Sequence, residues 1–480
     1  MKPSSVLVSI TLLCFLDSFS AIEMDNLSLY FLTWNVATKS PDGSVRIALD
    51  LPKNKNLLPD FYVIGLQEVK AQPQSLVSDS LFDNPWTNAF RYALASHDYV
   101  KVKSVRMVGL VLTVFSLRQH VEHLREIQVE TTRTGVYGLW GNKGAVTIRL
   151  KVYGCSLCFV NSHLAPHDNN LKDRIEDYET ILTDQKFSSN DATQIMYHDY
   201  IFWFGDLNFR INDPVRYSSL EIQRQVNLAR KKEGDFKELL KNDQLRQVMG
   251  EGLAFNGLSE GDIEFPPTYK FSLNSMEYDL KRRPAWTDRI LYKVNEDAYE
   301  NIKLELTQDS YRSIESYGIS DHKPVASRFT IKVFSNHVEQ HVEFVVNSQW
   351  YIDSENCVQI IFDADVKPSK ADWIGVFHDN FTSLDDYVSY SYLPNEQDSD
   401  QQCSAASTPS ETASSIFTLS RKMSDGQLEL RVTLTDQLIS EPGLYRLVYF
   451  TKDSHDVLGV SGPISIVSPD SASQKRSLDW

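Results

Sequence analysis

Apolar runs that end abruptly in polar residues are the main pattern in the first two thirds of the chain. The run Tyr200–Phe204 predicts a buried strand, and Asp206 and Asn208 follow it directly. On an extended chain, residues two apart point to the same side, so we expect this carboxylate and amide to project together. Such a pair at a strand end can hold and deprotonate a water molecule.

The same arrangement recurs elsewhere in the sequence. Several apolar runs with polar residues at one end predict one shared site at one edge of a sheet. Three runs end in Asn35, in Gln67 and Glu68, and in His163, and a fourth run begins just after His322.

Helical patterns separate these predicted strands. Apolar residues from Leu171 to Leu182 recur at helical spacing after the polar stretch 168–170, which offers an N-cap. The charged stretch Leu220–Lys241 also has helical character, and its charges suit a solvated face. Residues 26–335 therefore predict one α+β domain of strands, helices and loops.

The last third of the chain changes to short alternating strands with turns between them. This spacing predicts a smaller all-β sandwich over residues 340–468. Within it, the polar segment 394–416 predicts a disordered loop, and residues 469–480 predict a loose tail. The strands are expected at 342–346, 358–362, 373–377, 387–392, 428–434, 445–450 and 464–467.

Composition supports two domains and limits the partners. The 480-residue chain is 42% hydrophobic and 11% aromatic, enough for a large core. Its formal net charge is −16, which counts against a nucleic-acid binder that neutralises many phosphates. A phosphorylated substrate would then need a local basic pocket, and Lys281, Arg282 and Arg283 offer such a cluster.

The cysteines and the N-terminus bear on the compartment. Cys155 and Cys158 lie three apart in one predicted strand, so they point to opposite faces and suit buried, reduced core positions. Residues 1–25 hold a short apolar run after Lys2 that resembles a secretory signal. The few cysteines and the lack of a disulfide framework favour a cytoplasmic protein, with secretion as the alternative.

The residues at the predicted strand ends match the needs of phosphoester hydrolysis. Glu68 and Asn35 offer the oxygen ligands that Mg²⁺ prefers, and Asp206 with Asn208 can orient and deprotonate a water. Metal-assisted hydrolysis by direct attack of water needs little more than this.

Two histidines complete the set. His163 and His322 can hydrogen-bond phosphate oxygens as negative charge develops. Asp288 can hold one of the two imidazoles in the required tautomer.

Eight short motifs occur in order over about 300 residues: Thr33–Val36, Gly65–Glu68, Gly141–Gly144, Asn161–Leu164, Phe204–Arg210, Phe265–Lys270, Pro284–Leu291 and Ser320–Val325. Together they resemble the inositol polyphosphate 5-phosphatase family. That family belongs to the exonuclease–endonuclease–phosphatase superfamily. The resemblance implies an α+β fold in which two packed β-sheets are flanked by helices.

The second region resembles the SKICH domain that some members of that family carry. The stretches that carry this likeness are Asp372–Phe377, Asp386–Tyr390 and Gly443–Phe450. The short N-terminus without a proline-rich arm is similar to the skeletal muscle- and kidney-enriched type. The resemblance implies recruitment to a membrane or a partner, and the net acidity favours a protein partner over anionic lipid.

The resemblance also assigns roles within the site. It implies a Mg²⁺ site at Glu68 and Asn35, water activation by Asp206 and Asn208, and support of the scissile phosphate by His163, His322, Asp288 and Asp321. Family positions that contact the other phosphates of the substrate are matched by Tyr269, Lys270, Arg282, Asn142 and Lys143. Leu280 stands where the family often has a lysine, which makes Lys281 the candidate substitute.

These observations predict a Mg²⁺-dependent phosphatase. It would remove the 5-phosphate from phosphatidylinositol 4,5-bisphosphate and 3,4,5-trisphosphate, with soluble inositol polyphosphates as further candidates. We expect a cytoplasmic monomer that works at the surface of the plasma membrane or endoplasmic reticulum, without a nucleic-acid partner. The alternatives are a catalytically inactive adaptor that acts through the SKICH-like domain, and an endonuclease or sphingomyelinase of the same fold.

Overall fold

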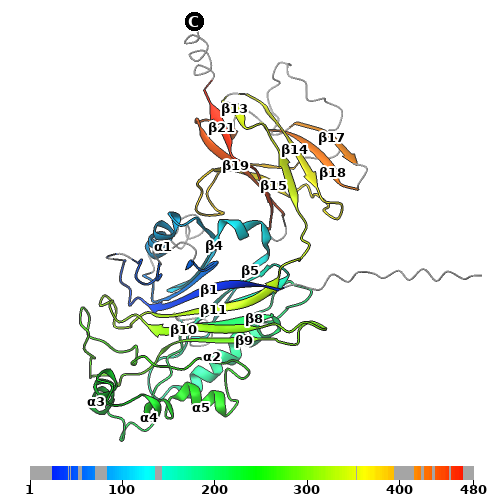
Figure 1. The fold of residues 1–480 in the computed structure, drawn as a ribbon. Helices are drawn as coiled ribbons and strands as arrows, with labels where there is room; N and C mark the ends of the chain where they lie inside the picture. Colours follow the sequence, from blue (N-terminus) through cyan, green and yellow to red (C-terminus); the bar gives the residue numbers. More distant parts are fainter. Residues whose placement is uncertain are drawn as a thin grey trace, which may run out of the picture.

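The computed structural model shows two β-sandwich units that follow each other along the chain (Figure 1). All of the described α-helices lie in the first unit, and the described part of the second unit is all-β, so the predicted fold class is confirmed. The structure describes residues 24–468 apart from 42, 44, 52–56, 71–83, 136–142, 353, 394–415, 423–425, 435–437 and 453–455. The predicted signal-like start, most of the predicted disordered loop, the tail 469–480 and Asn142 lie outside the described residues.

One sheet of the first unit consists of β1 (Met24–Asn35), β2 (Phe61–Gln67), β3 (Tyr99–Met107), β4 (Leu110–Leu117), β10 (Leu306–Ser313) and β11 (Val325–Phe334). Its strand order is β10-β11-β1-β2-β4-β3. β1 and β2 are parallel, and Asn35 pairs with Gln67, so their carboxyl ends share one edge. Every residue from Leu29 to Asn35 is buried, because both faces of this strand are covered.

The other sheet consists of β5 (Leu124–Arg133), β6 (Gly144–Val152), β7 (Cys155–His163), β8 (Tyr200–Asp206) and β9 (Asp288–Val294), in that order. β7 and β8 are parallel, and His163 pairs with Asp206. β9 is antiparallel to β8, which places Asp288 opposite Asp206. Cys155 and Cys158 are buried in the separate apolar clusters on the two faces, as their spacing predicts.

Aromatic side chains fill the space between the two sheets. Phe31 of β1 stacks on Phe202 of β8 with ring centroids 4.4 Å apart, and Phe159, Phe204 and Phe329 surround this pair. Aromatic rings bury large areas, so this cluster is the natural centre of the core. It holds β1 and β8 face to face and thereby fixes the relative positions of their carboxyl ends.

Helices cover the outer faces of the two sheets (Figure 1). In α1 (Pro85–Ala95), the Asn84 side chain accepts hydrogen bonds from the first-turn N–H groups, and Trp86, Phe90 and Leu94 face the sheet at helical spacing. Among the described residues, no helix has both the length and the apolar character that crossing a bilayer requires. Besides α1, the helices and 3₁₀-helices named here are η3 (Arg118–His123), α2 (Leu171–Asp184), η5 (Ile195–Tyr197), α3 (Ser219–Arg230), α4 (Lys237–Leu240) and α5 (Gln244–Gly250).

α2 begins at the residue that the sequence predicts, but its capping differs. Asn170 is the N-cap residue and its side chain makes no capping hydrogen bond. Asp168 instead forms an ion pair with Arg283, 2.7 Å between Oδ2 and Nη2. The side chain that could have capped the helix is therefore used to tie two loops together.

The second unit is a sandwich of two sheets, ordered β12-β14-β18-β17 and β13-β21-β19-β15-β16, with β20 beside β19. All seven predicted strands are present, and three short ones were not predicted, namely β13, β17 and β20. Their bounds are β12 (Val342–Val345), β13 (Gln349–Tyr351), β14 (Asn356–Phe362), β15 (Trp373–His378), β16 (Tyr387–Tyr392), β17 (Ile416–Lys422), β18 (Leu428–Leu434), β19 (Gly443–Phe450), β20 (Val457–Val460) and β21 (Ile464–Val467).

The second unit docks on the open edge of the first. Lys101 of edge strand β3 donates its backbone N–H to the carbonyl of Thr382 (2.8 Å) and accepts from the N–H of Leu384 (3.0 Å). Ser383, between them, thus forms an isolated parallel bridge with Lys101 of β3. Phe381 lies under the guanidinium of Arg118, 4.3 Å from carbon to ring centroid, and is part of the same apolar core as the first unit.

Candidate active site

Five polar side chains from both sheets meet at one edge of the first unit. Asn35, His163 and Asp206 are the last residues of β1, β7 and β8, and Asp288 is the first residue of β9. His322 lies three residues before β11, which runs antiparallel to β1. All five side chains are buried. The shared site that the strand-end pattern predicts is therefore formed by these residues.

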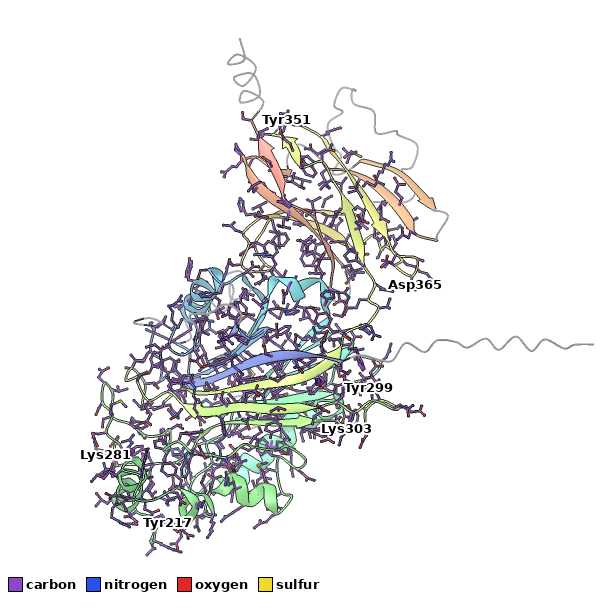
Figure 2. All side chains as sticks on the ribbon, viewed as in Figure 1. Tyr217, Lys281, Tyr299, Lys303, Tyr351 and Asp365 are labelled. Carbon is purple, nitrogen blue, oxygen red and sulfur yellow. The ribbon has the colours of Figure 1, made fainter. Side chains whose placement is uncertain are left out.

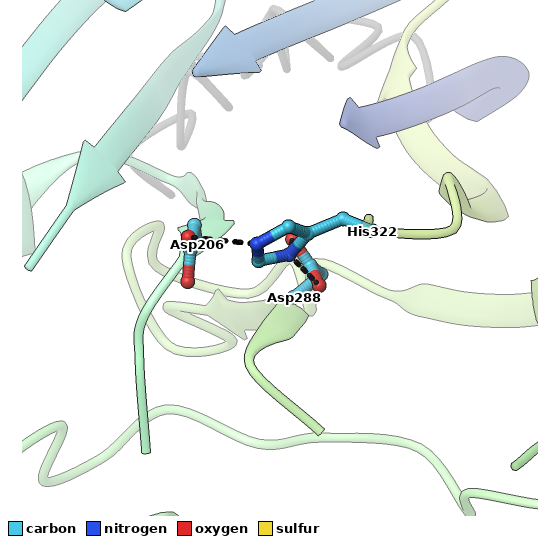
Figure 3. A group of neighbouring side chains, drawn as sticks. All are labelled: Asp206, Asp288 and His322. Carbon is cyan, nitrogen blue, oxygen red and sulfur yellow. Dashed lines mark hydrogen bonds and ion pairs between the residues drawn. The ribbon is translucent and has the colours of Figure 1, made fainter. Parts of the chain in front are cut away.

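His322 lies between two carboxylates (Figure 3). Its Nδ1 is 2.9 Å from Oδ2 of Asp288, and its Nε2 is 3.9 Å from Oδ2 of Asp206. Thr268 and Thr287 donate hydroxyl hydrogen bonds of 2.6 and 2.9 Å to the same Asp288 oxygen. Asp288 is thus fixed in place and orients the imidazole toward Asp206, which is the geometry that the sequence predicts for it.

Asp206 is also held from its other side. The Asn35 amide donates to its Oδ2 over 3.0 Å, and Nε2 of His163 is 3.3 Å from the same oxygen. Lys143 places its ammonium group against Nε2 of His163. The structure therefore brings Lys143 into the cluster of buried polar side chains, beside His163, and its substrate-binding role stays a prediction.

The surrounding charges give the two histidines opposite preferences. Burial favours neutral imidazole, but Asp288 and Asp206 raise the pKa of His322 to about 9. Burial and the neighbouring charge of Lys143 lower the pKa of His163. Burial works against ionisation of Asp206, yet His163, His322 and Lys143 hold its pKa well below the usual range. The site at neutral pH thus combines an ionised Asp206 with a protonated His322.

The backbone at Asn208 differs from the extended conformation that the sequence predicts. The chain leaves β8 after Asp206, because the N–H groups of Leu207 and Asn208 turn to the carbonyl of Thr287. Asn208 adopts a left-handed conformation with φ +59°, so the prediction that it shares an extended-chain face with Asp206 is wrong. Its backbone N–H nevertheless donates to Oδ1 of Asp206 over 3.2 Å. A tight turn, rather than alternation, joins the two residues.

Tyr269 and Lys270 lie at the rim of this cluster. The ring of Tyr269 is 4.5 Å from the His322 ring, and Nζ of Lys270 is 3.3 Å from a carboxylate oxygen of Asp321. Both residues that the sequence predicts to bind substrate therefore lie near His322, and Asp321 forms an ion pair with the lysine.

The basic cluster 281–283 divides into two parts. Lys281 and Arg282 are exposed, and their side chains make no ion pair or hydrogen bond within the described part of the chain. The Arg283 guanidinium donates hydrogen bonds to the Asp168 carboxylate and to the carbonyl of Tyr217. Two basic side chains therefore remain available to a ligand, whereas the third fixes the loop that carries them; Figure 2 labels Lys281 on this loop.

Glu68 and Asn35 fit the chemistry of a divalent cation. Glu68 follows β2 with φ +56°, its carboxylate has no hydrogen bond or ion pair among the described residues, and its charge acts on Lys143 and His163. Oδ1 of Asn35 accepts one hydrogen bond, from the N–H of Ala37, and keeps a second lone pair. Carboxylate and amide oxygens are ligands that Mg²⁺ accepts.

Asp206, Asp288 and His322 form a second conceivable cation site, since one ligand atom from each lies within 4.8 Å of the others. In this structure Nδ1 of His322 is hydrogen-bonded to Asp288, so the imidazole links the two carboxylates.

Two residues without a predicted role support the site. The Arg210 guanidinium lies over the Tyr269 ring, 4.7 Å from the centroid, and its Nε donates to the Asn208 carbonyl. Asp177 of α2 accepts from the N–H of Ala165, just after His163, and burial raises its pKa to about 6. Two sequence features could have pointed to these residues: Arg210 is part of the motif Phe204–Arg210, and Asp177 lies within a predicted helix.

Comparison with known proteins decides the family. The profile of the Endonuclease/Exonuclease/phosphatase family 2 matches residues 32–328, and that of the SKICH domain matches residues 342–466. Inositol polyphosphate 5-phosphatase K of Mus musculus is 34% identical over 92% of this chain and 90% of its own length. The chain belongs to the inositol polyphosphate 5-phosphatase family. The resemblance found in the eight sequence motifs is thereby confirmed.

Further relatives of this 5-phosphatase agree. Phosphatidylinositol 4,5-bisphosphate 5-phosphatase A of Mus musculus is 33% identical over 93% of the chain, which spans 42% of that longer relative. Among solved structures, the 5-phosphatase domain of SpSynaptojanin, in complex with inositol (1,4)-bisphosphate and calcium ion, matches with a TM-score of 0.55 and 30% identity over 65% of this chain and 86% of that one. Cimex nitrophorin, at 23% identity and a TM-score of 0.51 over 64% of this chain and 99% of its own, shares the fold alone.

Proposed function

We propose that this 5-phosphatase hydrolyses the 5-phosphate of phosphatidylinositol 4,5-bisphosphate and phosphatidylinositol 3,4,5-trisphosphate by direct attack of water. The observation that carries the proposal is that buried His322 lies between two buried carboxylates, 2.9 Å from Asp288 and 3.9 Å from Asp206. In such a site Asp206 can act as the base for the attacking water, and His322 can donate a hydrogen bond to the phosphate as its negative charge grows. The names of the relatives, one of which specifies phosphatidylinositol 4,5-bisphosphate, support the substrate class.

In this proposal, Asp206 accepts a proton from the attacking water while the water oxygen bonds to phosphorus. The bond from phosphorus to the 5-oxygen of the inositol breaks, and that oxygen keeps the electron pair and takes up a proton from solvent water. The imidazolium of His322, oriented by Asp288, donates to a non-bridging phosphate oxygen as its charge grows. A Mg²⁺ ion held by Glu68 and Asn35 would supply Lewis-acid stabilisation of the phosphoryl group.

Recognition of the neighbouring 4-phosphate would fall to the basic rim. Lys281 and Arg282 are exposed and unengaged in the described part of the chain, and Lys270 lies beside the catalytic histidine loop. Arginine and lysine bind phosphate through charge-assisted hydrogen bonds. Because the chain as a whole is acidic, such contacts stay local and would select a polyphosphorylated ring.

A lipid form of the substrate is favoured by apolar residues beside this rim. The loop 271–278 exposes Leu273 and Met276, and Lys323, next to His322, contacts this loop at the Ser275 carbonyl and the Met276 sulfur. Exposed apolar side chains at an active-site mouth can enter the headgroup region of a bilayer. We therefore place the reaction at a cytoplasmic membrane surface, either the plasma membrane or the endoplasmic reticulum.

The first test is phosphate release from a phosphoinositide panel with Mg²⁺ or EDTA. We expect release only from 5-phosphorylated inositides with Mg²⁺, and a loss of about 10²- to 10⁴-fold in Asp206→Asn, which removes the base. Asp213→Asn, an exposed acid on the next loop, is the matched control. Activity on nicked DNA or sphingomyelin alone would favour the endonuclease or sphingomyelinase alternative, and cellular effects unchanged in Asp206→Asn would favour the adaptor.

The second test separates lipid from soluble substrates. In the double variant Leu273→Ser with Met276→Ser, activity on vesicles should fall about tenfold, because burying two apolar side chains contributes at least this much. Activity on a soluble inositol polyphosphate should stay unchanged. Tyr92→Ser, which alters a highly exposed aromatic residue on α1, should affect neither. Equal losses on both substrates would contradict a bilayer contact through this loop.

A further inference from the structure

Two buried amide side chains join the two sheets of the first unit beneath the candidate active site. Gln67 is the last residue of β2, and its Nε2 donates to Oδ1 of Asn161 on β7 over 2.7 Å. Nδ2 of Asn161 donates in turn to the carbonyls of Leu66 on β2 (3.2 Å) and Val111 on β4 (2.8 Å). Because β2 and β4 belong to one sheet and β7 to the other, these hydrogen bonds cross the core.

This amide bridge lies where the apolar packing between the sheets ends. Val63 of β2 belongs to the core between the sheets, and alternation turns Gln67 the same way. Phe159 of β7 belongs to the same core, and Asn161 follows it on the same face. Both amides are 0% exposed. The bridge is therefore the last layer of the core before the polar cluster of the site.

β2 approaches the other sheet closely at this level. A Cβ atom at Gly65 would lie 2.4 Å from a ring carbon of Phe204 and 2.9 Å from Cγ of Asn161. Glycine is the residue that leaves room for such an approach. The close approach brings the Gln67 amide within hydrogen-bond reach of Asn161.

The bridge also lies next to both halves of the candidate site. Gln67 directly precedes Glu68, and Asn161 lies two residues before His163 on the same face of β7. The Glu68 carboxylate has no hydrogen bond or ion pair among the described residues, so no partner of its own fixes it. Its position relative to the other sheet therefore depends on the strand end that carries it.

Stability alone does not account for an amide at position 67. Nε2 of Gln67 also donates to the Thr33 hydroxyl over 3.1 Å, but Oε1 accepts no hydrogen bond from any described residue. A buried acceptor of this kind costs free energy, and an apolar side chain of similar size would avoid that cost. The distinctive contribution of Gln67 is therefore its directional link to the other sheet.

We propose that Gln67 is a positioning residue of the 5-phosphatase site. Its hydrogen bond to Asn161 holds Glu68, on one sheet, at a set distance from His163, on the other. The proposed cation ligand and the proposed phosphate-binding side chain then face the same phosphoryl group. Gln67 itself contacts neither cation nor substrate. The inference rests on the proposed function, because it takes Glu68 as a ligand of the cation.

The test measures Mg²⁺ binding to the full chain by calorimetric titration without substrate, alongside phosphate release. Gln67→Met keeps the length of the side chain and removes its hydrogen-bond donors. We expect this variant to bind Mg²⁺ about tenfold more weakly, because the ligand is no longer held in place. The Mg²⁺ concentration that gives half-maximal phosphate release should rise by the same factor.

Tyr200→Phe is the matched control. The Tyr200 hydroxyl donates to the carbonyl of Lys332 over 2.7 Å, which also joins the two sheets, but Tyr200 is at the opposite end of β8 from Asp206. This variant should unfold at a lower urea concentration, as Gln67→Met should, and yet bind Mg²⁺ as the wild type does. Equal weakening of Mg²⁺ binding in both variants would reduce Gln67 to a structural role and overturn the proposal.

Asn161→Ala breaks the bridge from the other sheet and decides the question if Gln67→Met does not fold. It should weaken Mg²⁺ binding, although Asn161 and Glu68 follow strands of different sheets. The double variant should bind Mg²⁺ no more weakly than the weaker single variant, since both changes remove one shared hydrogen bond. Additive losses, or unchanged Mg²⁺ affinity in Asn161→Ala, would overturn the proposal.

Failure of this inference is distinguishable from failure of the proposed function. If the bridge variants bind Mg²⁺ as the wild type does while the wild type releases phosphate, the inference alone is overturned. If the wild type binds Mg²⁺ and the bridge variants bind it more weakly, but no inositide is hydrolysed, the phosphatase proposal is refuted and the role of Gln67 in holding Glu68 remains. A wild type that binds no Mg²⁺ would overturn the inference.

Discussion

Two buried histidines approach the same carboxylate oxygen of Asp206, yet their surroundings favour different protonation states. His322 has Asp288 on its far side, whereas His163 has Lys143. An anion stabilises the imidazolium form and a cation opposes it, and water is too scarce in this buried site to screen either charge. The identity of one neighbouring side chain thus decides which histidine can donate a proton.

Asp288→Asn should remove the main favourable charge on His322, so its pKa should fall from about 9 toward the ordinary 6.5. A pKa raised in the folded state adds stability that is complete below 6.5 and lost as pH rises through about 9. The unfolding free energy of the wild type, measured in EDTA, should therefore fall over this range by up to about 3 kcal/mol more than that of the variant.

The check is urea unfolding at several pH values, with NMR titration of the His322 ring. Asp297→Asn, an exposed acid, serves as the control and should keep the wild-type slope. If Asp288→Asn loses stability as steeply as the wild type between these pH values, His322 does not carry the charge that we assign to it.

At the scale of elements, the close approach of β7 and β8 fixes the position of Asp206, which we propose as the catalytic base. A Cβ atom at Gly205 would lie 2.0 Å from the carbonyl oxygen of Ser162, and Gly205 has φ +139°. Only glycine fits such contact and conformation without strain. The same two strands end in His163 and Asp206, so their separation fixes the distance between these side chains.

Gly205→Ala should therefore push β8 away from β7. We expect a loss of about 3 kcal/mol in unfolding free energy and a marked fall in kcat, since Asp206 is the next residue. Gly250→Ala at the end of α5 is the control, because a Cβ there meets no atom within 4 Å. Chemical denaturation and phosphate release measure both effects. Wild-type activity in Gly205→Ala would show that the strand spacing is not critical.

At the scale of the whole molecule, the SKICH unit is built onto the catalytic unit rather than tethered to it. It covers the open edge of β3 through an isolated bridge at Lys101, and Lys101 also pairs with Asp385 at 3.1 Å. Two further hydrogen bonds cross the interface near η3. The backbone N–H of Glu126 donates to the Asp456 carboxylate, and the backbone N–H of Val460 donates to the Glu122 carboxylate. Covering an edge strand also protects it from unwanted pairing.

Phe381→Ala should test this rigid attachment. Phe381 is buried against the catalytic unit, so we expect a loss of about 3–5 kcal/mol at the interface. The single unfolding transition expected of the wild type should separate into two, while activity on a soluble substrate is retained. Leu444→Ala removes an exposed residue of the same unit and is the control. Two transitions already present in the wild type would contradict a single cooperative unit.

The sequence was most informative where local pattern and chemistry coincide. Alternation and apolar runs located the main strands and both buried cysteines, and the polar residues at the strand ends assembled into one site. The strands β13 and β20 escaped prediction, because three or four residues carry little alternation, and β17 was missed because it directly follows the polar segment read as a loop. Asn208 was misplaced because extended geometry was assumed beyond the end of β8.

The sequence by itself determined which residues are buried along each strand, which polar groups follow them, and the family to which the chain belongs. Those properties depend on neighbours one to four positions away. The tertiary structure alone decided that two carboxylates flank His322 whereas Lys143 lies against His163, that Arg210 lies over Tyr269, and that a segment of the SKICH unit pairs with β3. These outcomes depend on contacts between residues far apart in the chain, and local spacing carries no information about them.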